Sequence, residues 1–353
     1  MKGSGGSDYP HGVIRAIDPF RDLEDVVDLI GVAFGDRLDP AARATLERMR
    51  RFARRGPLMQ WLWALAGKAA MAPGLVWLVD SQVVGNVSLR RARGGDGYLI
   101  GNVVVHPDYR GRGIARALMN RAIAVLSRRG VPWVGLEVRA GNLVARGLYS
   151  RMAFREVGRT THMLWTPRPV SRTGKRARGS MRRGQRRDGE ELVELMKCMV
   201  PEEQRPLVEV VPADYRPSWE RRFDHWLRGE DEVWWLTQRG ASISGAIRAV
   251  RKRGRIPHRL ELLIRPGREG EVASDLVRQG LSALGGPPGK AVDTSVPNAT
   301  QLLVAALEGQ GFRELRVLIQ MKRDLKQGIR VHQVPDSRRS EGRARPSETW
   351  LEA

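Results

Sequence analysis

Apolar and polar positions change their period along the first half of the chain, and the changes predict successive helices and strands. Asp22–Phe34 places apolar residues three and four positions apart, the spacing of one helix face. The Asp39–Ala72 region reads as further helices. β-forming residues then dominate three stretches bounded by turn residues, which predict strands at Leu75–Asp80, Val83–Arg91 and Tyr98–Val105.

A second group of elements follows directly. Ile114–Arg128 predicts a helix with one apolar face, and Gly130 ends it. Trp133–Arg139 predicts a strand, Leu143–Met152 a helix, and the stretch Phe154–Trp165 predicts strands that close the unit.

The chain repeats this pattern once. Short matching segments lie about 156–160 residues apart: Val76-Trp77-Leu78 with Trp234-Trp235-Leu236, Gly85 with Gly245, Val105-His106-Pro107 with Ile264-Arg265-Pro266, Asn142 with Asn298, and Ala153-Phe154 with Gly311-Phe312. Upstream, Val26–Ile30 pairs with Leu192–Met196 at an offset of 166. A drift of about eight residues confined to the loop Asp39–Ala72 is what a duplicated domain predicts.

The repeat sets the predicted domain limits. We expect a flexible N-terminus at 1–12, a first copy at 13–167, a basic linker at 168–180, a second copy at 181–324 and a disordered basic tail at 325–353. The linker is rich in Arg, Ser, Gly and Pro, and the tail cannot bury apolar surface.

Charge adds one open alternative. The formal net charge is +22 and the pI about 11.2, and such basic chains often bind nucleic acid or membrane surfaces. Most of the basic residues are arginine, which the composition of a GC-rich genome explains as readily. Nucleic acid therefore stays a possible partner, and the oligomeric state is not readable.

The remaining composition argues against a metal site, an internal disulfide and a membrane-spanning segment. A single cysteine, Cys198, leaves no internal disulfide or cysteine-based zinc site, and the six histidines lack paired spacing. Leu58–Val79 is interrupted by Gln60, Lys68 and Pro73, so it predicts a core helix followed by a strand. The start, MKGSGGSDYP, has no apolar signal region, so we expect a cytoplasmic protein.

Asn102–Leu118 (NVVVHPDYRGRGIARAL) predicts an anion site. A strand runs into a glycine-containing turn that opens a helix, whose first N–H groups and dipole favour a pyrophosphate. A Rossmann fingerprint fails because Arg116 stands at the third glycine position, and the Walker motif is absent.

The pattern that fits is R-x-x-G-x-A, formed by Arg110, Gly113 and Ala115 after a strand ending in Val103-Val104-Val105. This resembles the acetyl-CoA signature of the GNAT N-acetyltransferases, over roughly Val13–Pro167. The resemblance implies an α+β fold, a mixed and mostly antiparallel sheet flanked by helices, in two tandem copies. It also implies acetyl-CoA as co-substrate, bound by Val103, Val104, Val105, Arg110, Gly111, Arg112, Gly113, Ile114, Ala115, Arg116 and Asn142.

Leu136–Phe154 (LEVRAGNLVARGLYSRMAF) most resembles the branch of the family that acetylates ribosomal-protein N-termini. The resemblance implies direct attack by a neutral amine on the thioester. Tyr149 would then protonate the CoA sulfur, or else be a half-buried aromatic packed on the sheet. Asn142 would contact the pantetheine arm, cap the following helix, or do both. Ala153 departs from the family, which usually has glycine there.

Glu137 is the candidate general base. It alternates with Leu136 and Val138 along the strand, so it faces the other side of the sheet. Its separation of twelve residues from Tyr149 matches the branch, and partial burial would raise its pKa toward neutrality. The alternative is a surface carboxylate paired with an arginine.

The second copy has lost the anion site in this interpretation. Its counterpart, Arg265–Leu276, keeps Gly267 and Gly270 but carries Glu269 and Glu271 where phosphate would sit, and like charges repel. Leu307 stands near the position of Tyr149. Tandem members of the superfamily resemble this arrangement, with one active and one degenerate half. The aromatic run at 233–236 reads as strand core more readily than as a binding face.

These observations predict an N-acetyltransferase acting on a primary amine of a small molecule, a peptide or protein N-terminus, or a lysine. Two alternatives stay open. The chain could be a CoA-sensing or nucleic-acid-binding regulator without chemistry, or a transferase of a longer acyl group.

Overall fold

The computed structural model describes residues 12–35, 43, 46–47, 49–51, 74–167, 181–216, 229–240, 242–254, 256–285 and 289–325. The predicted flexible N-terminus, linker and tail fall outside these ranges almost entirely, as does most of the predicted helical region Asp39–Ala72. Contacts divide the chain into two compact units. The first holds residues 1–91, 96–135 and 323–353, and the second holds 92–95 and 136–322.

The first unit contains four antiparallel strands in chain order, β1 (Val13–Ala16), β2 (Gly74–Val79), β3 (Gln82–Arg91) and β4 (Tyr98–Val105). Helices α1 (Pro19–Phe34) and α4 (Ile114–Arg128) accompany them. The predicted helix Ile114–Arg128 and strand Tyr98–Val105 have the bounds that the sequence gives them. The chain then leaves this unit along β5 (Trp133–Arg139), whose residues from Leu136 onward belong to the second unit.

Helix α1 forms because its apolar residues share one face, and burial of that face holds it on the sheet. Val27 is fully buried, and Leu23, Val26 and Ile30 pack with it against Val76 and Val104 of the strands.

An ion pair, called here the Arg15–Asp22 device, fixes the start of this helix. The Arg15 guanidinium of β1 donates two hydrogen bonds to the buried Asp22 carboxylate, at 2.6 and 2.7 Å. The same carboxylate accepts the backbone N–H of Asp18 at 2.7 Å, which caps the first turn.

The second unit holds the longer part of the sheet, in the order β12-β6-β11-β10-β9-β8-β7. Its elements, in chain order, are α5 (Leu143–Arg151), β6 (Arg155–Trp165), β7 (Met181–Arg183), α6 (Gly189–Met199), β8 (Glu230–Arg239), β9 (Ser242–Lys252), β10 (His258–Ile264), α8 (Glu269–Ala283), β11 (Val292–Pro297), α9 (Gln301–Gly309) and β12 (Phe312–Asp324). Strands β10 and β11 run parallel, and the other described pairs in this unit are antiparallel.

The two faces of this sheet carry separate cores. Ile247, Leu260 and Leu262 point to α8 and α9, while Leu236 and Leu263 point to α6. Within the predicted aromatic run, Trp234 is buried with the α6 core and Trp235 packs against the other core. The interpretation of this run as strand core is confirmed.

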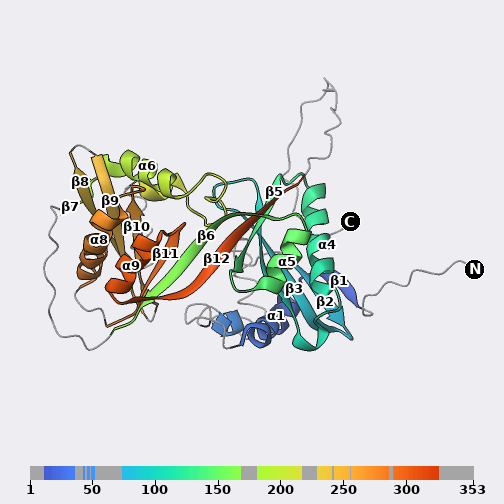
Figure 1. The fold of residues 1–353 in the computed structure, drawn as a ribbon. Coiled ribbons are helices and arrows are strands. Elements are labelled where there is room, and N and C mark those ends of the chain that lie inside the picture. Colours follow the sequence, from blue (N-terminus) through green and yellow to red (C-terminus); the bar gives the residue numbers. More distant parts are fainter. Residues whose placement is uncertain are drawn as a thin grey trace, which may run out of the picture. The chain divides into compact units, whose positions relative to one another are not determined.

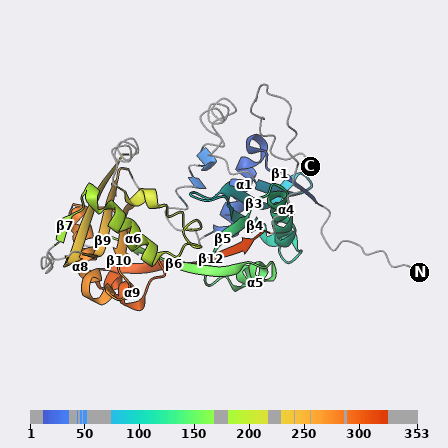
Figure 2. The same ribbon diagram turned by 90° about the horizontal axis from the view of Figure 1, so that it is seen from above.

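Strand β6 shows how the two copies are joined. It belongs to the first copy, yet it pairs antiparallel with β11 on one side and with β12 on the other, both from the second copy. Figures 1 and 2 both show β6 and β12 side by side along their length. The prediction that several strands near Phe154–Trp165 close the first copy is wrong. That stretch is a single strand, and its antiparallel partners come from the other half of the chain.

The duplication itself is confirmed by repeated details. Arg182 and Asp188 repeat the Arg15–Asp22 device, with two hydrogen bonds of 2.7 Å. Gly85 and Gly245 leave room for equivalent helices, α4 and α8. A Cβ on Gly85 would lie 3.1 Å from Leu118 Cδ1, and a Cβ on Gly245 would lie 2.7 Å from Leu276 Cδ1.

One predicted pair is wrong by two residues. Asn142 caps α5, its Oδ1 accepting the Ala145 N–H at 3.2 Å. The residue that caps α9 in the same way is Thr300, which accepts from the Leu303 N–H at 3.3 Å. Thr300, rather than Asn298, is therefore the structural counterpart of Asn142.

Helix α5 ends in a Schellman motif. The Ala153 N–H donates to Ser150 and the Phe154 N–H donates to Tyr149, both at 3.0 Å. The motif requires a left-handed residue, and Ala153 adopts φ 62° where its counterpart Gly311 has φ 92°. The Phe154 ring meets the Tyr149 ring at 6.0 Å between centroids, the apolar contact that accompanies this motif.

Ala153→Gly is expected to stabilise the protein by about 0.5–1 kcal/mol, because glycine removes the strain of a side chain at positive φ. Urea unfolding measures the change. Ala305→Gly in the exposed face of α9 is the matched control and should destabilise by about 0.5–1 kcal/mol. Equal destabilisation by both changes would contradict the strain at Ala153.

Candidate acyl-transfer site

The predicted anion site lies where β4 ends and α4 begins, within the first unit. Gly111 and Gly113 both adopt φ 77°, and Gly113 is the N-cap of α4. Among the described residues, no side chain caps this helix and nothing lies within 4 Å of a Cβ placed on Gly111. The turn therefore presents open backbone and the first N–H groups of a 15-residue helix, the features that bind phosphate.

Three exposed arginines surround this turn, and the first turn of α4 contains no acidic residue. Arg110 is tied back to the strand, its Nε donating to the Val105 carbonyl at 3.3 Å. Arg112 donates to the Asp108 carbonyl at 2.9 Å and lies 5.1 Å from the Tyr109 ring centroid. Arg116 is exposed on the first turn of the helix. Backbone, dipole and formal charge thus all favour an anion here.

Strand β4 carries a bulge just before this turn. Its register against β3 shifts between Asn86 and Ser88, and Asn102 adopts φ 48°. The fully buried Asn86 holds the bulge, donating to the Asn102 carbonyl at 3.0 Å. A bulge bends a strand and redirects its backbone groups. The buried Asn86 Oδ1 has no hydrogen-bond partner among the described residues.

Glu137 lies on β5, in the part that belongs to the second unit. Leu136 and Val138 are buried, whereas Glu137 is exposed, so the predicted alternation is confirmed. The predicted partial burial of Glu137 is wrong, because the strand presents this side chain to solvent. Its Oε1 accepts a hydrogen bond of 2.7 Å from Nε2 of Gln320 on β12.

Tyr149 lies in α5 and is buried, with 7% of its surface exposed. Burial raises the pKa of its hydroxyl to about 12, so the phenol keeps its proton at neutral pH. The Schellman contact with Phe154 fixes the ring, so the helix end that contains Ala153 also positions this side chain. Asn142, at the other end of α5, serves as its cap.

The predicted site residues therefore divide into two groups. Val103–Arg116 gather at the β4–α4 turn of the first unit, and Glu137, Asn142 and Tyr149 lie on β5 and α5 in the second. Sequence reasoning missed Gln320, because a single glutamine in a strand pattern carries no signal for the copy that it serves.

The equivalent turn of the second copy is filled by its own side chains. Glu269 and Glu271 stand in the first turn of α8, and Glu269 is buried. Glu271 forms salt bridges with Arg268 at 2.7 Å and Arg239 at 3.4 Å. These carboxylates already occupy the positive end of the helix dipole.

Across the described ranges there is no group of three His, Cys, Asp or Glu residues that could hold a metal ion. No helix in the same ranges combines the length and apolarity needed to cross a bilayer.

Comparison with known proteins relates part of the chain to a family of acetyltransferases. Residues 41–154 match the family model "Acetyltransferase (GNAT) family". The chain contains a GNAT domain. Over 55 residues it is 46% identical to the [ribosomal protein bS18]-alanine N-acetyltransferase of Escherichia coli K12, which is 16% of this chain and 37% of that protein. Over 84 residues it is 39% identical to an acetyltransferase of Pectobacterium atrosepticum, covering 24% of this chain and 57% of that one. The chain thus spans only 37% and 57% of the length of these two relatives.

Two solved structures extend the likeness to the whole fold. A GCN5-related N-acetyltransferase from Sphaerobacter thermophilus superposes with a TM-score of 0.60 and 16% identity, covering 91% of this chain and 98% of that one. A tandem GNAT protein from the clavulanic acid pathway gives 0.54 and 16%, covering 89% and 99%. At this identity the likeness establishes the tandem GNAT fold alone.

Proposed function

We propose that the chain is an N-acyltransferase that moves an acetyl group from acetyl-CoA to a primary amine. The observation that carries the proposal is the uncapped N-terminus of α4, opened by two left-handed glycines and flanked by arginines, inside a GNAT domain. The first N–H groups of α4, with Arg110, Arg112 and Arg116, hold the pyrophosphate of the co-substrate. Backbone groups of Val103–Val105 pair with its pantetheine arm.

Two side chains carry the proton transfers. The co-substrate supplies a thioester that a neutral amine attacks directly. Glu137 accepts the proton that the amine loses as the new C–N bond forms. Tyr149 donates its proton to the sulfur as the C–S bond breaks, and its raised pKa keeps that proton available. One proton is lost and one is gained, so the enzyme returns to its starting state after proton exchange with water.

The acceptor is proposed as a chemical class and not as a single compound. It is a primary amine of a small molecule or the N-terminus of a peptide or protein. The relative from E. coli is named for an alanine of a ribosomal protein, but the match covers only 16% of this chain. We place the reaction in the cytoplasm.

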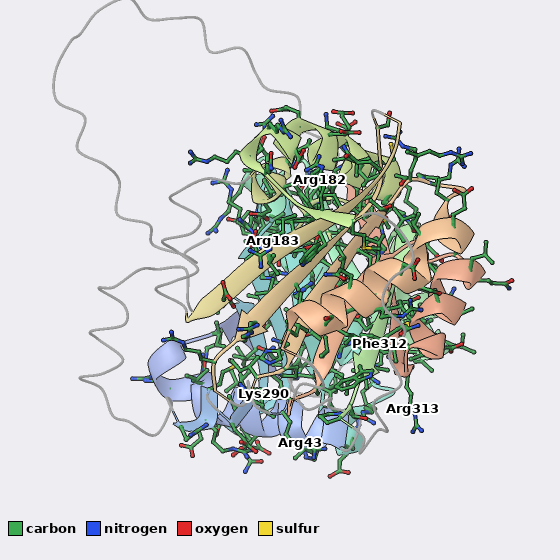
Figure 3. The ribbon with its side chains drawn as sticks, turned by 90° about the vertical axis from the view of Figure 1, so that its left-hand side faces the viewer. Arg43, Arg182, Arg183, Lys290, Phe312 and Arg313 are labelled. Atoms are coloured by element: carbon green, nitrogen blue, oxygen red, sulfur yellow. The ribbon has the colours of Figure 1, made fainter. Side chains whose placement is uncertain are left out.

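A binding function without chemistry is the second candidate, and the basic residues of β7 bear on it. β7 ends the strand order of its unit and carries Arg182 and Arg183 (Figure 3). Arg182 is held by Asp188 through two hydrogen bonds of 2.7 Å, and Arg183 lies 5.7 Å from the Trp235 ring centroid. Arg182 therefore serves the fold, as Arg15 does in the first copy, and does not favour a phosphate-binding regulator over the enzyme.

The test is CoA release from acetyl-CoA, followed as free thiol, against a panel of small amines and peptides. Thiol release that depends on one amine supports the transferase. Acetyl-CoA binding without turnover on any acceptor supports the sensing function, and absence of acetyl-CoA binding rejects both. A parallel series with longer acyl-CoA donors identifies the acyl group. Binding of DNA or RNA that weakens steeply with salt would support the regulator.

Tyr149→Phe is expected to lower kcat by about 10²-fold, since the leaving thiolate loses its proton donor. The pH profile supplies a second readout. Because the pKa of Tyr149 is about 12, the wild type keeps its rate up to about pH 10, where an ordinary tyrosine would be half ionised. A fall in the wild-type rate near pH 10 that disappears in the variant would show an unshifted tyrosine instead.

A further inference from the structure

The carboxylate of Glu137 is held by a residue from the other copy. Gln320 lies on β12, is fully buried, and donates from Nε2 to Glu137 Oε1 at 2.7 Å. The same Nε2 donates to Thr160 Oγ1 on β6 at 3.1 Å. The amide group of Gln320 is therefore fixed at two points, and Glu137 is fixed through it.

The orientation of Gln320 is set by a second buried glutamine. Gln204, also fully buried, donates from Nε2 to Gln320 Oε1 at 3.0 Å. This leaves the Nε2 of Gln320, rather than its oxygen, to face Glu137. A flipped amide would lose both bonds, which is costly for a buried polar group.

Gln204 is anchored in turn. Its Oε1 accepts from Asn298 Nδ2 at 2.7 Å, and its Nε2 also reaches the Arg159 carbonyl at 3.3 Å. The backbone N–H of Asn298 donates to the same carbonyl at 2.8 Å. A Cβ on Gly158 would lie 2.4 Å from Gln204 Cδ, so glycine there leaves the space for this side chain.

The result is a chain of amides in one direction, from Asn298 through Gln204 and Gln320 to the carboxylate of Glu137. Each member donates to the next, and successive hydrogen bonds of such a chain strengthen one another in a buried setting. All three amide residues come from the second copy. The carboxylate at the end of the chain belongs to the first.

The same cross-strand pair recurs in the other half. Ser295 lies 158 residues after Glu137, and His162 lies 158 residues before Gln320. Ser295 Oγ and His162 Nδ1 are 2.9 Å apart. Each copy thus sends one polar side chain from its last strand to the fifth strand of the other. Only the Glu137 end of this exchange carries a carboxylate.

We propose that Gln320 is a positioning residue for Glu137, so that the second copy completes the proton acceptor of the first. This rests on the proposed function, in which Glu137 is the base. The bond from Gln320 engages Oε1 of the carboxylate. It restricts the side chain to one position beside β12.

The test is a double-mutant cycle on the full chain, with thiol release as the assay. Gln320→Met keeps the length of the side chain and removes its donor. We expect kcat to fall about 10- to 100-fold with the KM for acetyl-CoA within about twofold of wild type. In the Glu137→Gln background the same change should have no further effect, because the two residues act as a unit. Gln238→Met, a matched change at an exposed position of β8, should leave kcat unchanged.

The outcomes separate this proposal from the proposed function. A loss from Gln320→Met that multiplies with the loss from Glu137→Gln would overturn it, because Gln320 would then act through general packing. Turnover that survives Glu137→Gln would overturn the base itself. If Gln320→Met folds poorly by circular dichroism, Thr160→Val replaces it in the cycle, since it removes the second acceptor of Gln320 at equal volume. A Thr160→Val loss that vanishes in the Glu137→Gln background supports the proposal, and an additive loss overturns it.

Discussion

Replacing Glu137 by glutamine is expected to lower kcat for acetyl transfer by about 10²- to 10⁴-fold, the range for loss of a general base. The amide keeps the shape of the side chain, and its carbonyl still accepts the hydrogen bond from Gln320. What it cannot do is take a proton from the attacking amine. The KM for acetyl-CoA should stay near the wild-type value, because the groups that hold the pyrophosphate lie on the β4–α4 turn. Steady-state thiol release measures both constants.

The matched control is Glu308→Gln, on the exposed face of α9 in the second copy. It makes the same change in charge and should leave kcat within about twofold. A Glu137→Gln variant that keeps more than half of the wild-type kcat would move the proton acceptor to another group. A large rise in the KM for acetyl-CoA would instead assign Glu137 to co-substrate binding.

The elements that carry the predicted site residues are local, and the sequence predicts them well. Ile114–Arg128 is a helix with the predicted bounds, and Trp133–Arg139 is a strand with the predicted bounds. Both follow from patterns within fifteen residues: an apolar helix face ended by Gly130, and alternation of Leu136 and Val138 with Glu137. The left-handed glycines at the turn likewise follow from glycine's freedom at positive φ.

The pairing of β6 could not be predicted in the same way. Its alternation fixes which side chains share a face and does not name the neighbouring strand. Both copies end in a strand of the same character, so pairing within a copy and exchange between copies have the same pattern. The bond from Gln320 to Glu137 depends on that exchange, and a residue 183 positions away gives no sign of it.

The expectation that Glu137 is partly buried is wrong for a related reason. Period-two alternation places a residue on one face of a strand, but exposure depends on what covers that face. The prediction gave Glu137 the partial burial that would raise the pKa of a base toward neutrality. In the structure the side chain is exposed and accepts a hydrogen bond from Gln320.

His162 on β6 occupies the counterpart of the Gln320 position, and it makes the stability of the protein depend on pH. Its ring is half-buried beside Ser295, on the antiparallel partner strand β11. Burial lowers the pKa of His162 to about 4, and the charge of Arg259 adds to the effect. On β11, burial raises the pKa of the Asp293 carboxyl, although Arg259 and Lys252 oppose this.

His162→Gln is expected to remove much of the acid sensitivity of folding. The unfolded histidine titrates near pH 6.5, so between about pH 6.5 and 4 the unfolded chain binds a proton that the folded chain refuses. That difference costs the wild type stability as the pH falls through this window, about 3 kcal/mol in total and about 2 kcal/mol between pH 7 and pH 5. Glutamine, the residue at the counterpart position 320, does not titrate, while Asp293 contributes equally to both proteins.

Urea unfolding at the two pH values should therefore show a loss smaller by about 2 kcal/mol in His162→Gln. His258→Gln, at a second histidine whose pKa is lowered, should change the loss less. Equal losses in wild type and His162→Gln would show that His162 takes up its proton in the folded state.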